Sequence, residues 1–459
     1  MRFIYILFLI LMLATLACQS AETPAPAELA TDSVSQSTAT LFVLPTEEFT
    51  FTPTPLPEGI IYVDTLEQEV YPFIENGKCS FAEAIIAANS GKVKDTCAAG
   101  SPNGSTIELM PGEYRFMQAD HTPPQEAWTV SVLDVGTALP MVIRPLAIRG
   151  NGATLIRDES AEPFRFFELM FGNFSLEDLT LKNGEVGEEW GGAIYSMNVS
   201  AALDGVRFIN NHADNGGGIY FTFGQLDVVN SEFIGNSAGF GGGGIYVDSS
   251  KTNITHTEFS NNHSVAQGGA LHAESTTLVI ADSIFINNVN EGLRGGAVYA
   301  TNINLNVTRS QFYKNQTDGY GGAFSIQNPI LAGIDPEDEN PLESMDQVPM
   351  ITQMMTSIPG FQSTLEAHPS GIFQDFHEDA QIHDSCFANN ITINPEDPNW
   401  TSGILGAASD VTNNYWGDPS GPSGMGPGAG DSVGKRITFA PFLTEAPEHC
   451  DPTLAQIQQ

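Results

Sequence analysis

Short apolar runs and single polar positions recur at a nearly constant interval over residues 190–327. One recurring phrase is two glycines, a small residue, an apolar residue and usually a tyrosine. Its six copies begin at Gly191, Gly216, Gly242, Gly268, Gly295 and Gly321, so the spacings are 25, 26, 26, 27 and 26 residues. A second phrase, Phe-x-x-Asn, keeps the same period and begins at Phe208, Phe233, Phe259, Phe285 and Phe312. Two phrases that stay in phase over the whole stretch predict a solenoid.

The residues between the two phrases indicate which kind of solenoid forms. They make short runs rich in Val, Ile, Thr and Phe, broken by Gly, Asn and Asp, as in 226–233, 276–285 and 304–312. Such runs are typical of strands of about five residues joined by turns, whereas a helical repeat needs about ten or more good helix formers. The predicted fold class is therefore all-β: a parallel β-helix with about 26 residues per coil, in which neighbouring coils lie about 4.8 Å apart.

Equivalent residues of successive coils should stack in columns along the axis. The apolar residue of the glycine phrase and the Phe of the second phrase form two columns that we expect to point inward. The first column contains Ile194, Ile219, Ile245, Leu271, Val298 and Phe324. The Asn column can pass side-chain amide hydrogen bonds from coil to coil, and it contains Asn211, Asn236, Asn262, Asn288 and Asn315. We interpret these columns as the fold itself rather than as a functional site.

A column of mostly aromatic residues follows the first inward column by one position, so strand alternation points it outward. Its members are Tyr195, Tyr220, Tyr246, His272 and Tyr299. A ladder of rings at about 5 Å spacing is a candidate ligand-binding surface, because flat rings can stack on sugar rings. The alternative, which we favour, is that these rings stack only on each other and on neighbouring loops.

The N-terminal residues differ from the repeats in composition. Residues 1–17 carry one arginine and an apolar run of about fifteen residues, which is short for a membrane span and typical of a secretory signal peptide. Cys18 follows a small residue, which resembles the lipobox of bacterial lipoproteins and implies cleavage before Cys18 and a lipid on its sulfur. The alternative is an ordinary signal peptide followed by a stray Cys. Residues 18–59 are rich in Ala, Thr, Ser, Pro and Glu, cannot bury a core and should form an extended tether.

The formal net charge of −38, with only 17 Lys and Arg residues, limits the possible partners. It argues against nucleic acid, whose phosphates need a basic surface, and against flat binding to anionic lipid. It permits divalent cations, but the acidic run over 335–346 lacks the glycine and the spacing of an EF-hand loop, so we expect no metal site and no cofactor.

Four cysteines follow Cys18, and an oxidising compartment allows them three pairings. We favour the sequential pairing, Cys79–Cys97 and Cys386–Cys450, because each pair would fasten one end of the solenoid. The first pair brackets a predicted short helix. Ser80 and Glu83 form a capping box, and Phe81, Ala84, Ile85 and Ala88 share one helical face. A helix here should cover the open first coil and block the addition of further strands.

The repeated phrases and segments near both ends of the chain resemble known families. Residues 79–89 read Cys-Ser-Phe-Ala-Glu-Ala-Ile-Ile-Ala-Ala-Asn and resemble the N-terminal motif of CSLREA-domain proteins, with Phe-Ala where Leu-Arg is usual. The two repeated phrases resemble those of polymorphic outer membrane proteins. Residues 413–422, Asn-Asn-Tyr-Trp-Gly-Asp-Pro-Ser-Gly-Pro, and 439–443, Phe-Ala-Pro-Phe-Leu, resemble the closing coils of bacterial right-handed β-helix surface proteins. The resemblance implies a right-handed parallel β-helix; such families include adhesins and carbohydrate enzymes, so it leaves the function open.

We therefore expect a single β-helix domain over residues 60–445, with the cap and first coils in 60–150, repeat coils in 151–327 and closing coils in 381–445. Residues 328–380 interrupt the repeat as an insertion that is acidic at first and then Met-rich. We interpret the insertion as a solvated loop, with a flap over a groove as the alternative. Residues 446–459 should form a tail.

Candidate catalytic residues are few. His256, Asp282 and Arg309 each stand three residues before a repeated Phe, so they should lie about 5 Å apart on successive coils. They suit an ion-pair ladder or an acid–base group. However, the position is a turn entry, where Asn and Asp are common, and we favour the structural role. The pectin-enzyme signatures Gly-His-Gly and Arg-Ile-Lys are absent.

The sequence as a whole predicts an exported, lipid-anchored cell-surface protein that binds an extracellular polysaccharide or surface glycan, as an adhesin does. The alternative is a polysaccharide lyase or glycoside hydrolase that works on a groove of the β-helix. We favour the non-enzymatic function, because the sequence shows a regular scaffold and few groups suited to catalysis.

Overall fold

The computed structural model describes residues 59–120, 136–292, 294–327, 380–392, 403–405, 409–434, 437–451 and 453–454. The chain divides into two compact units, Met1–Pro53 and Thr54–Gln459, and all described residues belong to the second. The expected signal peptide, Cys18, the tether up to residue 58 and the predicted insertion over 328–380, except for its last residue, lie outside the described residues.

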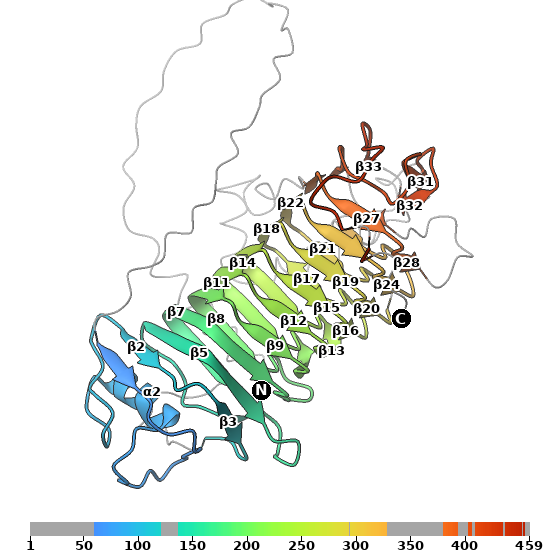
Figure 1. Cartoon of the computed structure of the whole chain (residues 1–459). Helices are drawn as coiled ribbons and strands as arrows, with labels where there is room; N and C mark the ends of the chain where they lie inside the picture. Colours follow the sequence, from blue (N-terminus) through green and yellow to red (C-terminus); the bar gives the residue numbers. More distant parts are fainter. Residues whose placement is uncertain are drawn as a thin grey trace, which may run out of the picture. The chain divides into compact units, whose positions relative to one another are not determined.

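The second unit is a parallel β-solenoid of about nine turns, with about 27 residues per turn. Strands of successive coils lie side by side from the blue cap to the red closing coils (Figure 1). They form a 25-stranded sheet, a 6-stranded sheet and a 2-stranded sheet. The described residues contain a single helix, so the predicted all-β fold class with stacked parallel coils and a short capping helix is confirmed.

The strands follow the two repeated phrases. The early coils contain β1 (Ile60–Tyr62), β2 (Ser105–Glu108), β3 (Glu113–Phe116), β5 (Leu146–Arg157) and β7 (Phe167–Lys182). The glycine phrase leads into β8 (Ile194–Asp204), β11 (Ile219–Val229), β14 (Ile245–Thr255), β17 (Leu271–Glu274), β21 (Val298–Thr301) and β25 (Phe324–Gln327). In later coils the long strand divides, and its second part is β18 (Thr277–Ala281), β22 (Asn304–Thr308), β26 (Ala380–His383) or β30 (Ser409–Asp410).

The Phe-x-x-Asn phrase begins in a short strand of the same sheet: β9 (Arg207–Ile209), β12 (Glu232–Ile234), β15 (Glu258–Ser260), β19 (Ile284–Ile286), β23 (Gln311–Tyr313) and β27 (Cys386–Ala388). The 6-stranded sheet contains β10 (His212–Asn215), β13 (Ser237–Gly241), β16 (His263–Ser264), β20 (Val289–Asn290), β24 (Gln316–Thr317) and β28 (Ile391–Thr392). The closing coils add β29 (Ile404–Leu405), β31 (Pro422–Gly424), β32 (Gly430–Val433) and β33 (Ile437–Thr438). The 2-stranded sheet consists of β4 (Gly136–Thr137) and β6 (Phe164–Arg165).

The repeated Phe residues fill the interior, as predicted. Their rings are fully buried and stack nearly parallel, with centroid distances of 4.6, 4.7, 4.6 and 4.9 Å from Phe208 to Phe312. The stack continues through Phe387 to Trp416 at 5.2 and 5.0 Å. These distances follow from identical residues in register on strands that lie about 4.8 Å apart. The apolar column of Ile194, Ile219 and their equivalents belongs to the same buried core.

The Asn column forms the predicted side-chain ladder. Asn262 Nδ2 donates to Asn288 Oδ1 at 3.0 Å and to the Phe233 carbonyl at 2.8 Å. The same contacts repeat from Asn211 to Asn390, so the amide oxygens satisfy donors of the preceding coil and the amide nitrogens reach the following one. The ladder ends at Asp431, whose Oδ2 accepts from Asn390 Nδ2 at 2.6 Å. Asp431 is buried, and this burial raises the pKa of its carboxyl to about 7.

Each coil turns at single residues in the left-handed backbone region. Gly216, the first glycine of its phrase, has φ 65°, and a Cβ there would lie 2.1 Å from the Ile219 carbonyl oxygen. Only glycine fits so close to the next strand. A second left-handed position precedes the Phe strand and holds Asp178, Gly205, Asn230, His256, Asp282, Arg309, Asp384 and Asn413. The glycine phrase therefore has a conformational cause, the sharp corner of the coil, whereas the Asn column is explained by its side-chain ladder.

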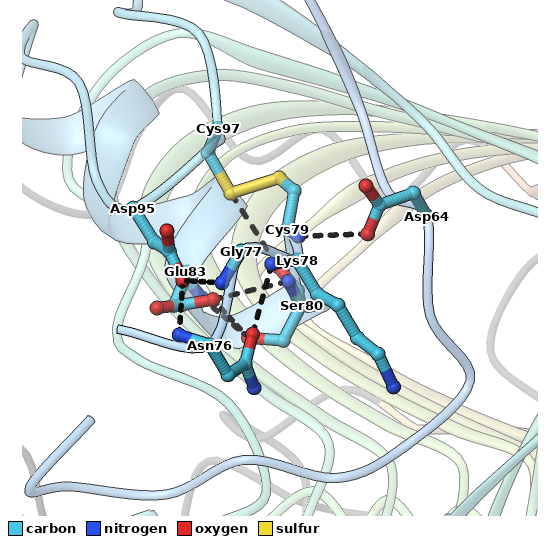
Figure 2. Close-up of a disulfide and its surroundings, with 9 residues drawn as sticks. All are labelled: Asp64, Asn76, Gly77, Lys78, Cys79, Ser80, Glu83, Asp95 and Cys97. Atoms are coloured by element: carbon cyan, nitrogen blue, oxygen red, sulfur yellow. Dashed lines mark hydrogen bonds between the residues drawn. A yellow bond between two sulfur atoms is a disulfide. The ribbon is translucent and has the colours of Figure 1, made fainter. Parts of the chain in front are cut away.

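Helix α2 (Phe81–Ser90) closes the N-terminal end of the solenoid. It has the predicted capping box, in which the Ser80 hydroxyl accepts from the Glu83 N–H and the Glu83 carboxylate accepts from the Ser80 N–H. A disulfide joins Cys79, just before the helix, to Cys97 in the loop after it (Figure 2). Asp64 accepts from the Cys79 N–H at 2.7 Å, so the cap is tied to the chain that follows the first strand.

The capping helix is buried on nearly all sides, whereas the sequence indicated a single apolar face. All residues from Phe81 to Asn89 are buried, including Glu83, and burial raises the pKa of the Glu83 carboxyl. The loop after the helix contributes to this burial. A Cβ at Gly100 would lie 2.6 Å from the Ala88 Cα, so the loop packs directly against the helix backbone.

The C-terminal residues fold back onto the last repeat coils. The Cys386–Cys450 disulfide joins them to β27, and the Asp451 N–H donates to Gln311 Oε1 at 2.8 Å. Ile286 and Tyr313 form a separate buried cluster with Cys450, against which Leu454 packs. Both disulfides thus follow the sequential pairing, one at each end of the solenoid.

Candidate functional site

The aromatic column forms one continuous stack of rings. Tyr195, Tyr220 and Tyr246 lie nearly parallel at centroid distances of 5.6 and 5.2 Å. His272 continues the stack at 4.2 Å from Tyr246, and Tyr299 meets His272 edge-on at 4.9 Å. The ladder of about 5 Å spacing that the register predicts is therefore present.

Trp190 packs beside the first two rings of this stack. Its ring lies 4.9 Å from that of Tyr220 and 6.4 Å from that of Tyr195. Trp190 lies outside the predicted aromatic column, although its place directly before a glycine pair is a visible signal in the chain.

The rings lie outside the main core, as strand alternation predicts, but they are not exposed. The five members of the column have only 2–9% of their surface accessible. Tyr195, Tyr220 and Tyr246 share a cluster of their own with Met141 and Met170. Because each ring covers the face of the next, the flat faces that a sugar would need are already occupied. This packing agrees with the alternative favoured from the sequence, in which the rings stack on each other, and it leaves a ligand access only to the ring edges.

Two arginines lie against the ends of the stack. The Arg165 guanidinium is 5.6 Å from the ring centroid of Tyr195, and that of Arg294 is 5.9 Å from the centroid of Tyr299. Arg165 is fully buried, and burial lowers the pKa of its guanidinium. Its Nε donates to the Gly191 carbonyl at 3.3 Å, so it also fastens the first glycine phrase to the preceding coil.

Titratable groups in the stack are held in their neutral forms. Burial lowers the pKa of His272 to about 3, and neither ring nitrogen has a hydrogen-bond partner among the described residues. Burial raises the pKa of the Tyr195 phenol to about 12. The Tyr246 hydroxyl donates to Glu274 Oε2 at 3.0 Å, and burial raises the pKa of Tyr246 further. A permanently neutral His and un-ionised phenols are poor acid–base catalysts near pH 7.

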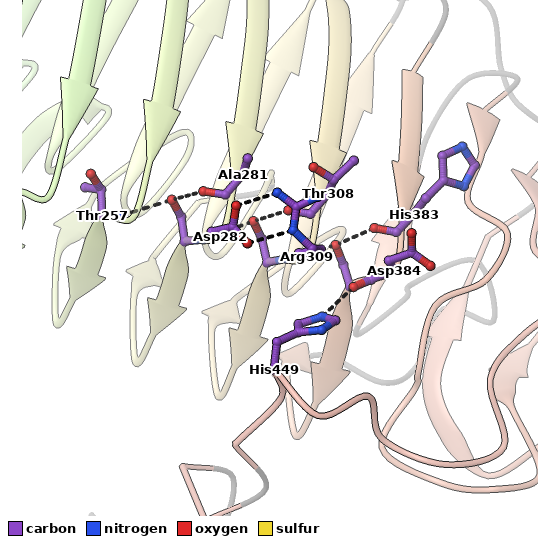
Figure 3. Close-up of polar contacts among 11 residues, drawn as sticks. Thr257, Ala281, Asp282, Thr308, Arg309, His383, Asp384 and His449 are labelled. Atoms are coloured by element: carbon purple, nitrogen blue, oxygen red, sulfur yellow. Dashed lines mark hydrogen bonds and ion pairs between the residues drawn. The ribbon is translucent and has the colours of Figure 1, made fainter. Parts of the chain in front are cut away.

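The polar column, formed by the candidates His256, Asp282 and Arg309, contains an ion pair. Arg309 donates to both carboxylate oxygens of Asp282, at 2.8 and 2.5 Å, and this pairing lowers the pKa of the Asp282 carboxyl (Figure 3). His256 stands on the preceding coil and is exposed. The three residues have φ angles of 49°, 51° and 47°, so all of them occupy the left-handed corner of the coil. The structure thus brings the three candidates into register and bonds two of them to each other.

Two further polar residues join this column. Asp384 occupies the next left-handed corner, three residues before Phe387, an offset that the sequence could have revealed. His449 arrives from the C-terminal segment and its Nε2 lies 2.7 Å from the Asp384 carbonyl oxygen (Figure 3). No repeat pattern predicts the position of His449, because the Cys386–Cys450 disulfide sets it.

Metal binding at this end is prevented by the disulfide. Cys386, His449 and Cys450 place one potential ligand atom each within 4.8 Å of one another. The two sulfur atoms are bonded to each other, however, and a metal requires free thiolates.

The cap offers little room for a substrate. A hollow lined by residues that include Leu66, Glu69 and Tyr114 encloses about 10 Å³, roughly the space for one water molecule. Within the described ranges, no helix has both the length and the apolar character needed to cross a membrane.

Comparison with known proteins identifies the repeats. The Chlamydia polymorphic membrane protein repeat matches residues 205–222 and 256–274, each of which contains one Phe-x-x-Asn phrase and one glycine phrase. No curated protein and no solved structure matches the chain. The chain therefore carries Chlamydia polymorphic membrane protein repeats on a parallel β-solenoid, a combination that suggests a surface protein of the outer-membrane type.

Proposed function

We propose that this chain is an exported cell-surface protein that binds extracellular glycans, as an adhesin does, and that a lipid on Cys18 holds it at a membrane. The observation that favours binding over catalysis is the pairing of Asp282 with Arg309 in the polar column. Asp282 and Arg309 are bonded to each other through two hydrogen bonds, and Asp282 is ionised well below neutral pH. A carboxyl that acts as a general acid needs a raised pKa, whereas the pairing with Arg309 lowers the pKa of Asp282.

The charge of the chain favours neutral glycans over acidic ones. A formal charge of −38 repels polyanions such as uronic-acid polysaccharides and nucleic acids. The repeated coils present a long, regular surface, and rigid sheets of this kind place binding groups at fixed distances without loss of conformational entropy on binding. Neutral extracellular polysaccharide is therefore the proposed partner.

A binding protein should retain glycans without shortening them. We expect the purified protein to bind at least one neutral polysaccharide of a mixed neutral and uronic-acid panel, with no change in chain length measured by size-exclusion chromatography. Asp282→Asn should leave retention within about twofold of the parent, because Asp282 is already bonded to Arg309. Shortening of a glycan that disappears in Asp282→Asn, His256→Ala or Arg309→Ala would establish the lyase or hydrolase function instead.

The lipid anchor has a separate test. Cys18→Ser should move the processed protein from the membrane fraction to the soluble fraction, because a signal peptide cleaved before residue 18 leaves only the lipid as an attachment. Ser20→Ala is the matched control and should stay in the membrane fraction. Continued membrane fractionation of processed Cys18→Ser protein would contradict the anchor.

A further inference from the structure

Two phenylalanines are exposed at one corner of the early repeat coils. Phe171 and Phe223 have 51% and 49% of their surface accessible, while the repeated Phe residues of the core are fully buried. Both lie at the turn within a long strand, Phe171 in β7 and Phe223 in β11. Neither belongs to the two repeated phrases, so the fold does not require an aromatic residue at either position.

The corner that holds them is a left-handed position in every described coil from β7 to the start of β22. Its members are Phe171, Asn198, Phe223, Ser249, Ser275 and Asn302, with φ angles between 48° and 68°. Asn tolerates this region, whereas a bulky side chain there is strained. An aromatic ring that is both strained and exposed gains little from folding. Strain of this kind tends to persist where a binding or catalytic role maintains it.

The register fixes the spacing of the two rings. Met170 pairs with Met197, and Met197 pairs with Thr222, so the residues that follow them, Phe171, Asn198 and Phe223, stand on three consecutive coils. Two coil spacings of about 4.8 Å separate the two rings by about 9.6 Å along the axis. The exposed Asn198 lies between them.

The corner positions themselves are uncharged and open, although an acidic residue, Asp248, pairs with Thr222 directly beside Phe223. Phe171, Asn198, Phe223 and Ser249 carry no charge, although the whole chain has a formal charge of −38. A glycine follows each ring, Gly172 and Gly224. A Cβ at Gly224 would lie 2.0 Å from the Val199 carbonyl oxygen, so the chain packs flat against the neighbouring coil beside the ring.

We propose that Phe171 and Phe223 are a glycan-binding pair that stacks on alternate sugar units of a neutral β-1,4-linked glycan. This inference rests on the glycan-binding function proposed above. Successive sugar units of such a glycan alternate in orientation, so every second unit presents the same face to a surface. An aromatic ring on every second coil of the protein matches that repeat. Apolar sugar faces stack on aromatic rings. Asn198 supplies an amide, with both donors and an acceptor, opposite the hydroxyls of the unit in between.

The test measures the affinity of the purified full protein for cellohexaose and chitohexaose by titration calorimetry. The double variant Phe171→Asn, Phe223→Asn should bind at least about tenfold more weakly than the parent. Its melting temperature should be equal or higher, because Asn suits the left-handed corner better than Phe. A merely structural role of the two rings predicts the opposite, a lower melting temperature with unchanged affinity.

Two further variants separate the causes. The double variant Phe171→Tyr, Phe223→Tyr keeps both rings and should bind like the parent. Val265→Asn removes another exposed apolar side chain, 46% accessible, that lies outside this corner, and should also bind like the parent. Equal affinity of the parent and of the double variant Phe171→Asn, Phe223→Asn for neutral glycans would overturn the site but leave the proposed function intact. A parent that binds no glycan of the wider panel would overturn the proposed function itself.

Discussion

Phe259→Ala is expected to lower the free energy of unfolding by about 3–5 kcal/mol. The Phe259 ring is fully buried and stacks on Phe233 at 4.7 Å and on Phe285 at 4.6 Å. Alanine leaves a cavity between two rings that the backbone register holds in place, so the site cannot collapse to fill it. Denaturant unfolding of parent and variant, followed by far-UV circular dichroism, measures the difference.

The matched control is the same substitution at an exposed ring. Phe171→Ala removes a side chain that is 51% accessible and should change the free energy of unfolding by no more than about 0.5 kcal/mol. Equal midpoints for Phe259→Ala and the parent would mean that the Phe column does not form the core.

Asp431→Asn should remove a pH dependence from the stability of the protein. The pKa of Asp431 is raised from 3.8 to about 7 by burial, so the folded protein holds this proton more tightly than the unfolded chain does. The contribution of Asp431 to stability is therefore complete below about pH 4 and is lost as the pH rises towards 7. A shift of this size corresponds to about 4 kcal/mol, because each pKa unit is worth about 1.4 kcal/mol.

The amide of the variant continues the asparagine ladder without a titrating group. Its oxygen can accept from Asn390 as the Asp431 carboxylate does, at 2.6 Å in the parent. We expect the difference in free energy of unfolding between variant and parent to grow from pH 4 to pH 7 and to reach about 4 kcal/mol in favour of the variant. Asp318→Asn, at an exposed position, is the control and should show a nearly constant difference. A constant difference for Asp431→Asn as well would show that Asp431 does not titrate in this range.

The fold was predictable because its signals repeat. Six glycine phrases and their Phe-x-x-Asn partners define strands, corners and inward columns at once, and stacking in register turns one sequence period into continuous ladders. The burial of the tyrosine ladder was not predictable from alternation alone. Alternation gives the side of the strand on which Tyr220 lies, but not the neighbours that cover it, such as Trp190 at 4.9 Å.

Sites formed by residues outside the repeats could not be predicted from the sequence for a related reason. His449 reaches Asp384 only through the Cys386–Cys450 disulfide, which joins residues 64 positions apart. The exposure of Phe171 and Phe223 depends on their place at a corner rather than on a strand face, and nothing in the residue type distinguishes them from the buried Phe residues. Backbone conformation, which a periodic pattern does not specify, makes the difference.

The positions of the two disulfides determine how the solenoid would respond to mechanical force. Cys79–Cys97 and Cys386–Cys450 close the two ends, and none of the cysteines lies between residues 97 and 386. A pull on both ends would therefore leave the closed loops intact and separate the middle coils one after another. Each coil of about 27 residues would release roughly 90 Å of extended chain, against about 4.8 Å that it occupies along the axis. A solenoid with these two disulfides therefore extends under load by unfolding its middle coils, while the disulfide-closed loops at both ends stay intact.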